Sequence, residues 1–340
     1  MNLDRREFAA LLLGGAASVS VSGPARAQSD PLPSWSDGSA KAAILAFVHA
    51  TTDAASPGFL PVAERIATFD QDGTLWVEQP VYTQIVFAFS RVPKAVKERP
   101  ELASEPGFKA ILSGNPEAIA HLSEEQLLSV VGATLTGMDV EAYRDEVAAW
   151  IKDARDPRWK RPFIELVYQP QIELLKYLRA NGYRTFIVTG GGQDFVRAYA
   201  EQIYGIPVEQ VVGTMFGLSF ERGSDGKTIL TREPKLLLND DSGGKPEGIH
   251  LVIGRRPHLA FGNSAGDREM LEYVKAGPWA SLAMIVLHDD GAREYAYGPA
   301  QGLPDSKIGT FPQELYDQAI RDGWIVVSMK NDWKRIFAFE

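Results

Sequence analysis

The chain has 340 residues, of which 45% are hydrophobic and 23% are charged, as is usual for a soluble globular protein. Its net charge of −9 and the lack of a long basic run argue against nucleic acid as a partner. The chain contains no cysteine, which excludes disulfides, thiol catalysis and cysteine-based zinc sites.

The first 27 residues have the pattern of an export signal. Arg5 and Arg6 precede an apolar, small-residue stretch over 9–21, and Ala25-Arg26-Ala27 is an A-x-A cleavage pattern. The paired arginines resemble a twin-arginine signal, which predicts a bacterial protein that is periplasmic or secreted after cleavage near Ala27. A membrane anchor is the alternative. Because the stretch is short and diluted with Gly and Ser, no stable membrane span is expected.

Residues 28–58 are predicted to form a linker and a leading helix. The stretch 28–40 is rich in Ser, Pro, Asp and Gly, which is typical of a linker. A helix is expected over 41–51, because Ile44, Leu45 and Val48 recur at helical spacing.

The next element is predicted to be a buried strand over Ile66–Phe69, a short and largely apolar run. It leads directly into Asp70-Gln71-Asp72-Gly73-Thr74, which predicts a tight glycine turn.

Residues 81–169 are predicted to form a helical cap, because their apolar periodicity is helical and contains no convincing strand pattern. Ser123-Glu124-Glu125-Gln126 has the sequence of a capping box at the start of one helix. Asp139 is expected to cap a second helix with Tyr143, Val147 and Ile151 along one face.

From residue 170 onward, strand and helix patterns alternate. The pattern predicts a helix over 172–178, a strand over 184–189, a helix after the three glycines 190–192 that runs through Phe195, Tyr199 and Ile203, a hairpin of 214–220 with 228–232, strands over 259–261 and 282–287, a helix over 311–321 and a last strand over 324–328. This alternation predicts an α/β fold with a mainly parallel, Rossmann-like sheet and helices on both faces. We assign 59–80 and 170–340 to this core.

Polar clusters directly follow three of the predicted strands. They are Asp70 with Asp72, Thr189 with its glycines, and Asn263 with Asp267. Ligands of such sheets bind at the carboxyl ends of the strands, so the clusters are expected to form one site. Paired carboxylates attract hard cations such as Mg²⁺, and a carboxylate can also attack phosphorus. The alternative for the first cluster is a turn that only ends a strand.

The same clusters carry a family resemblance. Phe69-Asp70-Gln71-Asp72-Gly73-Thr74-Leu75, Ile187-Val188-Thr189-Gly190, Lys245 within Gly244-Lys245-Pro246, and Phe261-Gly262-Asn263-Ser264-Ala265-Gly266-Asp267 resemble, in order, motifs I to IV of the haloacid dehalogenase (HAD) superfamily, phosphatase branch. The sequence is most similar to the phosphoserine phosphatase-like members, which also carry a helical cap between motifs I and II and a hairpin before motif III.

This resemblance implies an Mg²⁺-dependent phosphatase for small phosphate monoesters. Asp70 would attack phosphorus and become an aspartyl-phosphate, and Asp72 would act as acid and then base. Thr189, Gly190 and Gly191 would bind phosphoryl oxygens. Lys245 would neutralise charge on Asp70 and the phosphoryl group. Mg²⁺ would bind Asp70, the backbone carbonyl of Asp72 and a motif IV group.

Motif IV departs from the pattern of many relatives, which have Asp where this chain has Asn263. An Asn carbonyl can bind Mg²⁺ without supplying charge. Asp267 is therefore the favoured ligand, either directly or through water. Lys235 is the alternative to Lys245 as the motif III residue.

Residues just after motif I are candidates for specificity. Glu78 is a candidate reader of a substrate amine, with ordinary surface exposure as the alternative. Trp76 and Tyr82 could line the pocket, although packing is the commoner role of such aromatics. His288 is expected to have a structural or rim role.

Several rival functions remain. The second aspartate of motif I argues against a dehalogenase, and the export signal argues against an intracellular phosphomutase. An inorganic pyrophosphatase of the same fold and a non-catalytic phosphate-ligand binding protein stay open as alternatives. The sequence leaves the substrate and the oligomeric state open.

Overall fold

The computed structural model describes residues 30–223 and 226–340, so the predicted export signal lies outside the described residues. Residues Pro31–Glu340 form one compact unit. In the part of the chain that is described, no helix is both long and apolar enough to cross a membrane.

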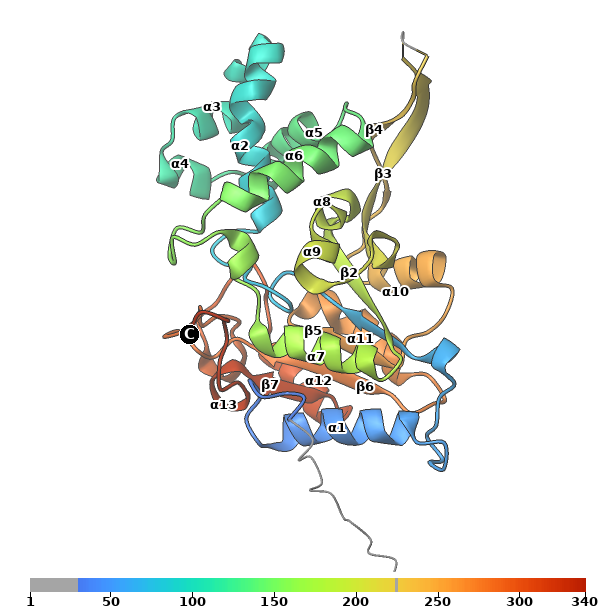
Figure 1. Ribbon diagram of the computed structural model, residues 1–340. Coiled ribbons are helices and arrows are strands. Elements are labelled where there is room, and N and C mark those ends of the chain that lie inside the picture. Colours follow the sequence, from blue (N-terminus) through green and yellow to red (C-terminus); the bar gives the residue numbers. More distant parts are fainter. Residues whose placement is uncertain (1–29, 224–225) are drawn as a thin grey trace, which may run out of the picture. The chain divides into compact units, whose positions relative to one another are not determined.

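Seven strands form one sheet in the order β4-β3-β2-β1-β5-β6-β7 (Figure 1). Their bounds are β1 Ile66–Phe69, β2 Arg184–Gly192, β3 Val211–Arg222, β4 Thr228–Leu238, β5 Leu259–Gly262, β6 Leu282–Leu287 and β7 Ile325–Ser328. The pairs β1–β2, β1–β5, β2–β3, β5–β6 and β6–β7 are parallel, and β3–β4 is antiparallel. This confirms the predicted mainly parallel sheet.

The helices lie before, between and after these strands. Their bounds are α1 Ser39–Thr52, α2 Thr83–Glu98, α3 Pro106–Leu112, α4 Pro116–Ala120, α5 Glu124–Leu135, α6 Val140–Asp153, α7 Gln169–Ala180, α8 Gln193–Arg197, α9 Ala200–Tyr204, α10 Gly244–Gly248, α11 Arg268–Lys275, α12 Gln313–Arg321 and α13 Met329–Asp332.

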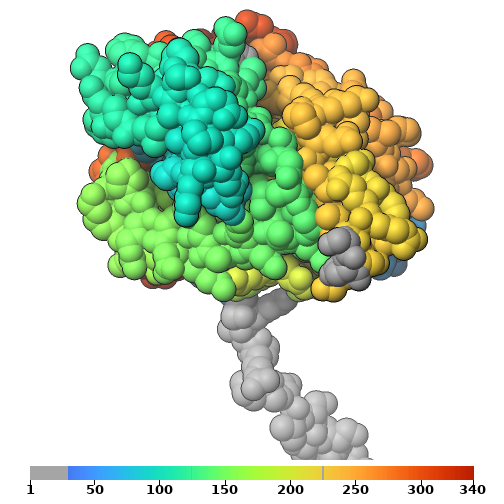
Figure 2. Space-filling model, turned by 90° about the horizontal axis from the view of Figure 1, so that it is seen from above, coloured from blue at the N-terminus to red at the C-terminus, as the bar shows by residue number. Residues whose placement is uncertain are grey.

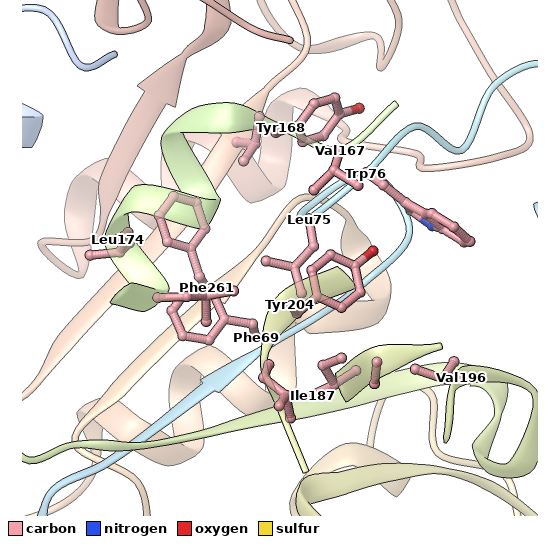
Figure 3. Close-up of a cluster of buried hydrophobic side chains, with 14 of the residues drawn as sticks. Phe69, Leu75, Trp76, Val167, Tyr168, Leu174, Ile187, Val196, Tyr204 and Phe261 are labelled. Atoms are coloured by element: carbon pink, nitrogen blue, oxygen red, sulfur yellow. The ribbon is translucent and has the colours of Figure 1, made fainter. Parts of the chain in front are cut away.

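Both faces of the sheet are covered, which explains why its central strands are continuous apolar runs. Ile187 and Phe261 face a core formed with α1 and α7, whereas their neighbours Val188 and Ala260 face a second core formed with α11 and α12. In the first core, the rings of Phe69 and Phe261 stack with centroids 6.1 Å apart (Figure 3). Packing on both faces of the sheet therefore holds β1 in position, and with it the turn that follows.

The segment 81–169 is helical throughout its regular structure and contains no strand, as predicted. The capping box of Ser123 with Gln126 is present at the start of α5, and Asp139 caps α6. These helices cluster with the sheet as part of one unit, so their description as a separate cap domain stays a prediction.

Other expectations need correction. The three glycines 190–192 belong to β2, and the helix expected after them breaks at Tyr199 into α8 and α9. The hairpin strands are also longer than predicted, and most of the added residues extend the second strand.

Residues expected to form a linker are packed against the sheet instead. Leu32 and Trp35 are fully buried. The Trp35 ring lies 6.0 Å from that of Trp333, and its indole N–H donates to the carbonyl of Pro170. The segment was predicted to be a linker from its polar composition, but its two large apolar residues, Leu32 and Trp35, pack into the core.

Helices α2–α6 and the hairpin of β3 and β4 lie beyond the carboxyl end of β1 (Figure 1). Seen from that side, the helices and the hairpin lie next to each other (Figure 2). They are joined where the N–H of Gly137 donates to the carbonyl of Arg232 at 2.7 Å. The buried guanidinium of Arg232 also lies 3.8 Å from the centre of the Tyr143 ring on α6. These contacts fix the two walls of the space above the sheet.

Candidate active site

The turn after β1 brings Asp70 and Asp72 to the carboxyl edge of the sheet. Gly73 has a φ of +77°, and a Cβ at this position would lie 2.1 Å from Nδ2 of Asn263. Only glycine therefore permits both the left-handed backbone and the close approach of the motif IV loop.

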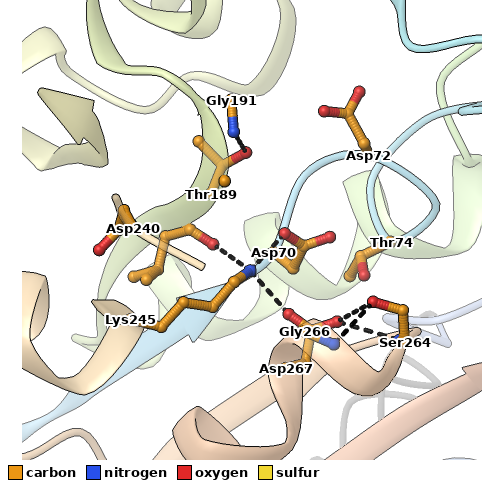
Figure 4. A network of polar contacts seen from close by, with 12 residues as sticks. Asp70, Asp72, Thr74, Thr189, Gly191, Asp240, Lys245, Ser264, Gly266 and Asp267 are labelled. Atoms are coloured by element: carbon orange, nitrogen blue, oxygen red, sulfur yellow. Dashed lines mark hydrogen bonds and ion pairs between the residues drawn. The ribbon is translucent and has the colours of Figure 1, made fainter. Parts of the chain in front are cut away.

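Lys245 lies at the centre of the charged network (Figure 4). Its Nζ donates to Oδ1 of Asp70 at 2.6 Å, to Oδ1 of Asp267 at 2.7 Å and to the carbonyl of Val188 at 3.0 Å. The side chain is only 2% exposed. Lys235, the alternative, is exposed on β4. The structure therefore brings Lys245, and not Lys235, to the predicted nucleophile.

This network contains more acidic than basic groups. Burial by itself would lower the pKa of Lys245, but the charges of Asp267 and Asp70 outweigh it and raise that pKa well above its usual range. Burial, followed by the charge of Asp267, raises the pKa of Asp70 despite the opposing lysine. One ammonium group thus faces two buried carboxylates, and the excess negative charge favours a further cation.

Asp72 is held by an aromatic side chain. Its Oδ1 accepts a hydrogen bond of 2.7 Å from the indole N–H of Trp76. Trp76 is fully buried and stacks on Tyr199 with ring centroids 5.1 Å apart. Burial raises the pKa of Asp72 to about 6, while the Trp76 hydrogen bond acts in the opposite direction. A carboxyl with this pKa can give and take a proton near neutral pH.

Thr189 at the end of β2 faces the same space. Its Oγ1 accepts the N–H of Gly191 at 3.0 Å, which leaves the hydroxyl hydrogen free to donate to a ligand. The N–H of Gly192 donates to Oε1 of Gln84 on α2 at 2.7 Å. A Cβ on Gly191 would lie 3.7 Å from Oδ2 of Asp72, so that oxygen points toward the glycines.

The two motif IV residues have different roles in the structure. Oδ2 of Asp267 accepts the backbone N–H groups of Asn263 and Ser264, while its Oδ1 accepts from Lys245. The side chain of Asn263 accepts from the Thr74 hydroxyl at 3.1 Å. Asp267 therefore orients the lysine and the loop, and the amide of Asn263 lies against the motif I turn.

Glu78 is buried and lines the cavity, so the alternative of ordinary surface exposure is wrong, and its reading of a substrate amine stays a prediction. It is 2% exposed, and its Oε1 accepts hydrogen bonds of 2.7 Å from Nδ2 of Asn263 and from the hydroxyl of Tyr297. Burial raises the pKa of Glu78 well above its usual range, and the charges of Asp72 and Asp70 act in the same direction, against the Tyr297 hydrogen bond. The structure thus shows Glu78 supporting the motif IV loop.

His288 supports the motif I turn from behind. Its Nε2 lies 2.8 Å from the carbonyl oxygen of Gly73, which can only accept, so Nε2 carries a hydrogen. Its Nδ1 lies 3.2 Å from Oε2 of the fully buried Glu294, and its ring stacks on Tyr297. The structural role expected for His288 is confirmed. Glu294 and Tyr297 were missed, because they belong to no motif and only the fold brings them here.

A cavity of about 550 Å³ opens above Asp70 and Asp72. Thr189, the three glycines, Lys245 and Tyr82 contribute to its lining. Its walls are formed by residues of α2, α5 and the hairpin. The predicted catalytic and substrate-binding residues therefore line one cavity, whereas Trp76 packs beneath it.

Asp70 and Asp72 at the base of this cavity, with Asn263 beside the motif I turn, fit Mg²⁺ by the chemistry of their donors. Asp70, the backbone carbonyl of Asp72 and the carbonyl of Asn263 would supply oxygen ligands, which this ion prefers. The excess buried negative charge favours the same ion. Within residues 30–223 and 226–340, no three His, Cys, Asp or Glu side chains converge as a metal cluster.

The fold and the site define an α/β enzyme with carboxylates, a lysine and a threonine at the carboxyl ends of parallel strands. Sequence comparison agrees: the profile of the haloacid dehalogenase-like hydrolases matches residues 67–272, more than half of the chain. The chain belongs to this family of hydrolases. No curated protein matches it.

Several solved structures are similar to this chain at low sequence identity. A conserved protein of unknown function from Anaerococcus prevotii is 17% identical with a TM-score of 0.49, covering 74% of this chain and 86% of that one. A phosphoserine phosphohydrolase-like protein from Francisella tularensis is 14% identical with a TM-score of 0.35, covering 67% and 89%. A probable phosphoserine phosphatase from Vibrio cholerae is 15% identical with a TM-score of 0.36, covering 69% and 60%.

Proposed function

We propose that the protein is an Mg²⁺-dependent phosphatase that hydrolyses small phosphate monoesters through an aspartyl-phosphate on Asp70. The observation that carries this proposal is the 2.6 Å contact between Lys245 Nζ and Oδ1 of Asp70 at the base of the cavity. The contact holds the carboxylate in one orientation and leaves Oδ2 available as the nucleophile.

The residues would act in two steps. Oδ2 of Asp70 attacks phosphorus while the ester P–O bond breaks, and Asp72 gives its proton to the leaving oxygen. Asp72 then takes a proton from a water molecule, which attacks phosphorus and releases phosphate from Asp70. Thr189 donates to a phosphoryl oxygen, and Lys245 compensates the charge on Asp70 throughout.

Bound Mg²⁺ would supply further charge neutralisation at the phosphoryl oxygens. Asp70, the Asp72 carbonyl and Asn263 would hold it. Asp267 would contribute directly or through water, since its oxygens also hold Lys245 and backbone N–H groups.

We also propose that the enzyme is exported. The support is the sequence alone: Arg5-Arg6, the apolar stretch 9–21 and the cleavage pattern at Ala25-Arg26-Ala27. An exported phosphatase would act on esters outside the cytoplasm. Cell fractionation tests this by comparing the chain with a variant in which Arg5-Arg6 is changed to Lys-Lys. We expect the variant to stay in the cytoplasm. Unchanged export of the variant would contradict the twin-arginine route.

The activity is tested by phosphate release from a panel of monoesters and pyrophosphate, with Mg²⁺ and with chelator. We expect Mg²⁺-dependent release that falls by about a thousandfold or more in Asp70→Asn and in Lys245→Met, since each loses a group that acts at the reacting phosphorus. Lys235→Met is the matched control, because Lys235 is exposed on β4 and outside the network.

The other outcomes separate the rival functions. Release from pyrophosphate alone would identify a pyrophosphatase. Saturable phosphate-ester binding without release, by folded protein with metal present, would identify a binding protein and overturn the proposal.

A further inference from the structure

The cavity above Asp70 has an uneven chemistry. Its base is charged, but its upper walls carry apolar side chains from three separate elements: Ile85 of α2, Leu127, Leu128 and Val131 of α5, and Phe216 and Leu236 of the hairpin. Leu128 is 62% exposed and Leu236 is 50% exposed. Large apolar side chains that remain in contact with solvent inside a cavity are a common feature of ligand sites.

Among the described residues that line this cavity, Lys245 has no second basic side chain beside it. Lys245 is the one Lys or Arg among the described lining residues, and its three hydrogen bonds already go to Asp70, Asp267 and Val188. The other charged lining residues are all acidic: Asp70, Asp72, Glu78 and Asp241. A second phosphate or a carboxylate on the substrate would therefore meet like charge and no partner.

A substrate amine also lacks its expected partner. The Glu78 side chain is only 2% exposed, and its Oε1 already accepts from Asn263 and Tyr297. Asp241 is exposed and lies beside Gly190, so it is the remaining acidic group that an amine could approach.

We propose that the enzyme prefers phosphate monoesters whose alcohol part is apolar, with the alkyl or aryl body between α5 and the hairpin. This inference rests on the proposed phosphatase function. It predicts that substrate selection comes from apolar contact above the phosphate and not from a salt bridge to the rest of the substrate.

A homologous series tests this with little change in the chemistry of the leaving group. Ethyl, propyl, butyl and hexyl phosphate all release primary alcohols, so differences in kcat/KM report contact with the walls. We expect kcat/KM to rise by about two- to fourfold for each added methylene, as partial burial of a CH₂ group predicts. Butyl phosphate should exceed both 4-aminobutyl phosphate and 3-carboxypropyl phosphate, each by about tenfold or more.

Two leucines provide matched variants. Leu128→Gln places an amide in the wall and should flatten the chain-length gradient. Leu251→Gln is the control, because Leu251 is 69% exposed and does not line the cavity, so both the gradient and the activity should match the original protein.

The outcomes distinguish this inference from the proposed function. Turnover of ethyl phosphate with no chain-length gradient would overturn the inference and leave the phosphatase standing. A preference for 4-aminobutyl phosphate would also overturn it, and would assign selection to Asp241. No release from any ester would overturn the proposed function, and the inference with it.

Discussion

At the scale of single residues, the site depends on how each acidic side chain is held. Asp70 is bound by Lys245, Asp267 by Lys245 and two backbone N–H groups, and Asp72 by Trp76. The contact of Lys245 with Asp70 was expected from the family resemblance, whereas the contacts of Asp267 with Lys245 and with the backbone were not, because Asp267 was expected to be a metal ligand. Trp76 lies four residues after Asp72 and was considered only as pocket lining or packing. No pattern in a single sequence says that an indole N–H will meet a particular carboxylate.

The Trp76 contact leads to a prediction on pH dependence. A hydrogen bond to the ionised carboxylate lowers the pKa of Asp72, so Trp76→Phe should raise it above its value of about 6. Because the leaving alcohol needs the proton of Asp72, kcat/KM for an alkyl phosphate should fall at a higher pH in the variant. A hydrogen bond worth about 1.5 kcal/mol would move the pH at which kcat/KM falls upward by about one unit. A pH–rate profile measures this; an unchanged or lower pH for that fall would contradict the role of Trp76.

At the scale of secondary structure, short-range signals were reliable. The capping box at Ser123 and the Asp139 cap are present, because caps depend on residues only two or three apart. The glycines 190–192 were less predictable: they continue β2 because Gly192 pairs with Thr214 of β3, and that pairing is not local. The hairpin exceeded its predicted length for a related reason, since 211–213 pair with β2 and Leu236 and Leu238 pair with β3.

The cap of α5 gives a second prediction. Ser123→Ala removes the acceptor for the N–H of Gln126 and should lower the free energy of unfolding by about 1 kcal/mol. Ser123→Asp keeps an acceptor at the same position and should retain most of the stability. Urea unfolding of the three proteins tests this. Equal loss in both variants would show that the cap itself is not the cause.

At the scale of the whole molecule, folding buries an acidic group whose ionised form destabilises the folded state. Asp240 is fully buried near Lys245, and burial raises the pKa of its carboxyl to about 7. The unfolded chain releases this proton near pH 4, whereas the folded chain keeps it until about pH 7. Between these values the folded state binds more protons, so the contribution of Asp240 to stability falls as the pH rises.

Asp240→Asn should remove that dependence. The amide stays neutral, so the decrease in the free energy of unfolding between about pH 4 and pH 7 should be smaller in the variant by on the order of a few kcal/mol. Denaturant unfolding at several pH values compares the two proteins. If the difference between them does not change with pH, Asp240 is ionised in the folded protein and the prediction fails.

The sequence by itself determined the alternation of strands and helices in the core, the helical character of 81–169 and the motif residues Asp70, Asp72, Thr189, Lys245, Asn263 and Asp267. These depend on local periodicity, on turn chemistry and on a resemblance carried by short motifs. Only the tertiary structure decided that Lys245 and not Lys235 meets Asp70, that Glu78 is buried against Asn263, and that Trp35 packs on Trp333. Each of these contacts joins segments far apart in the chain, and the packing of the two sheet faces selects the partners.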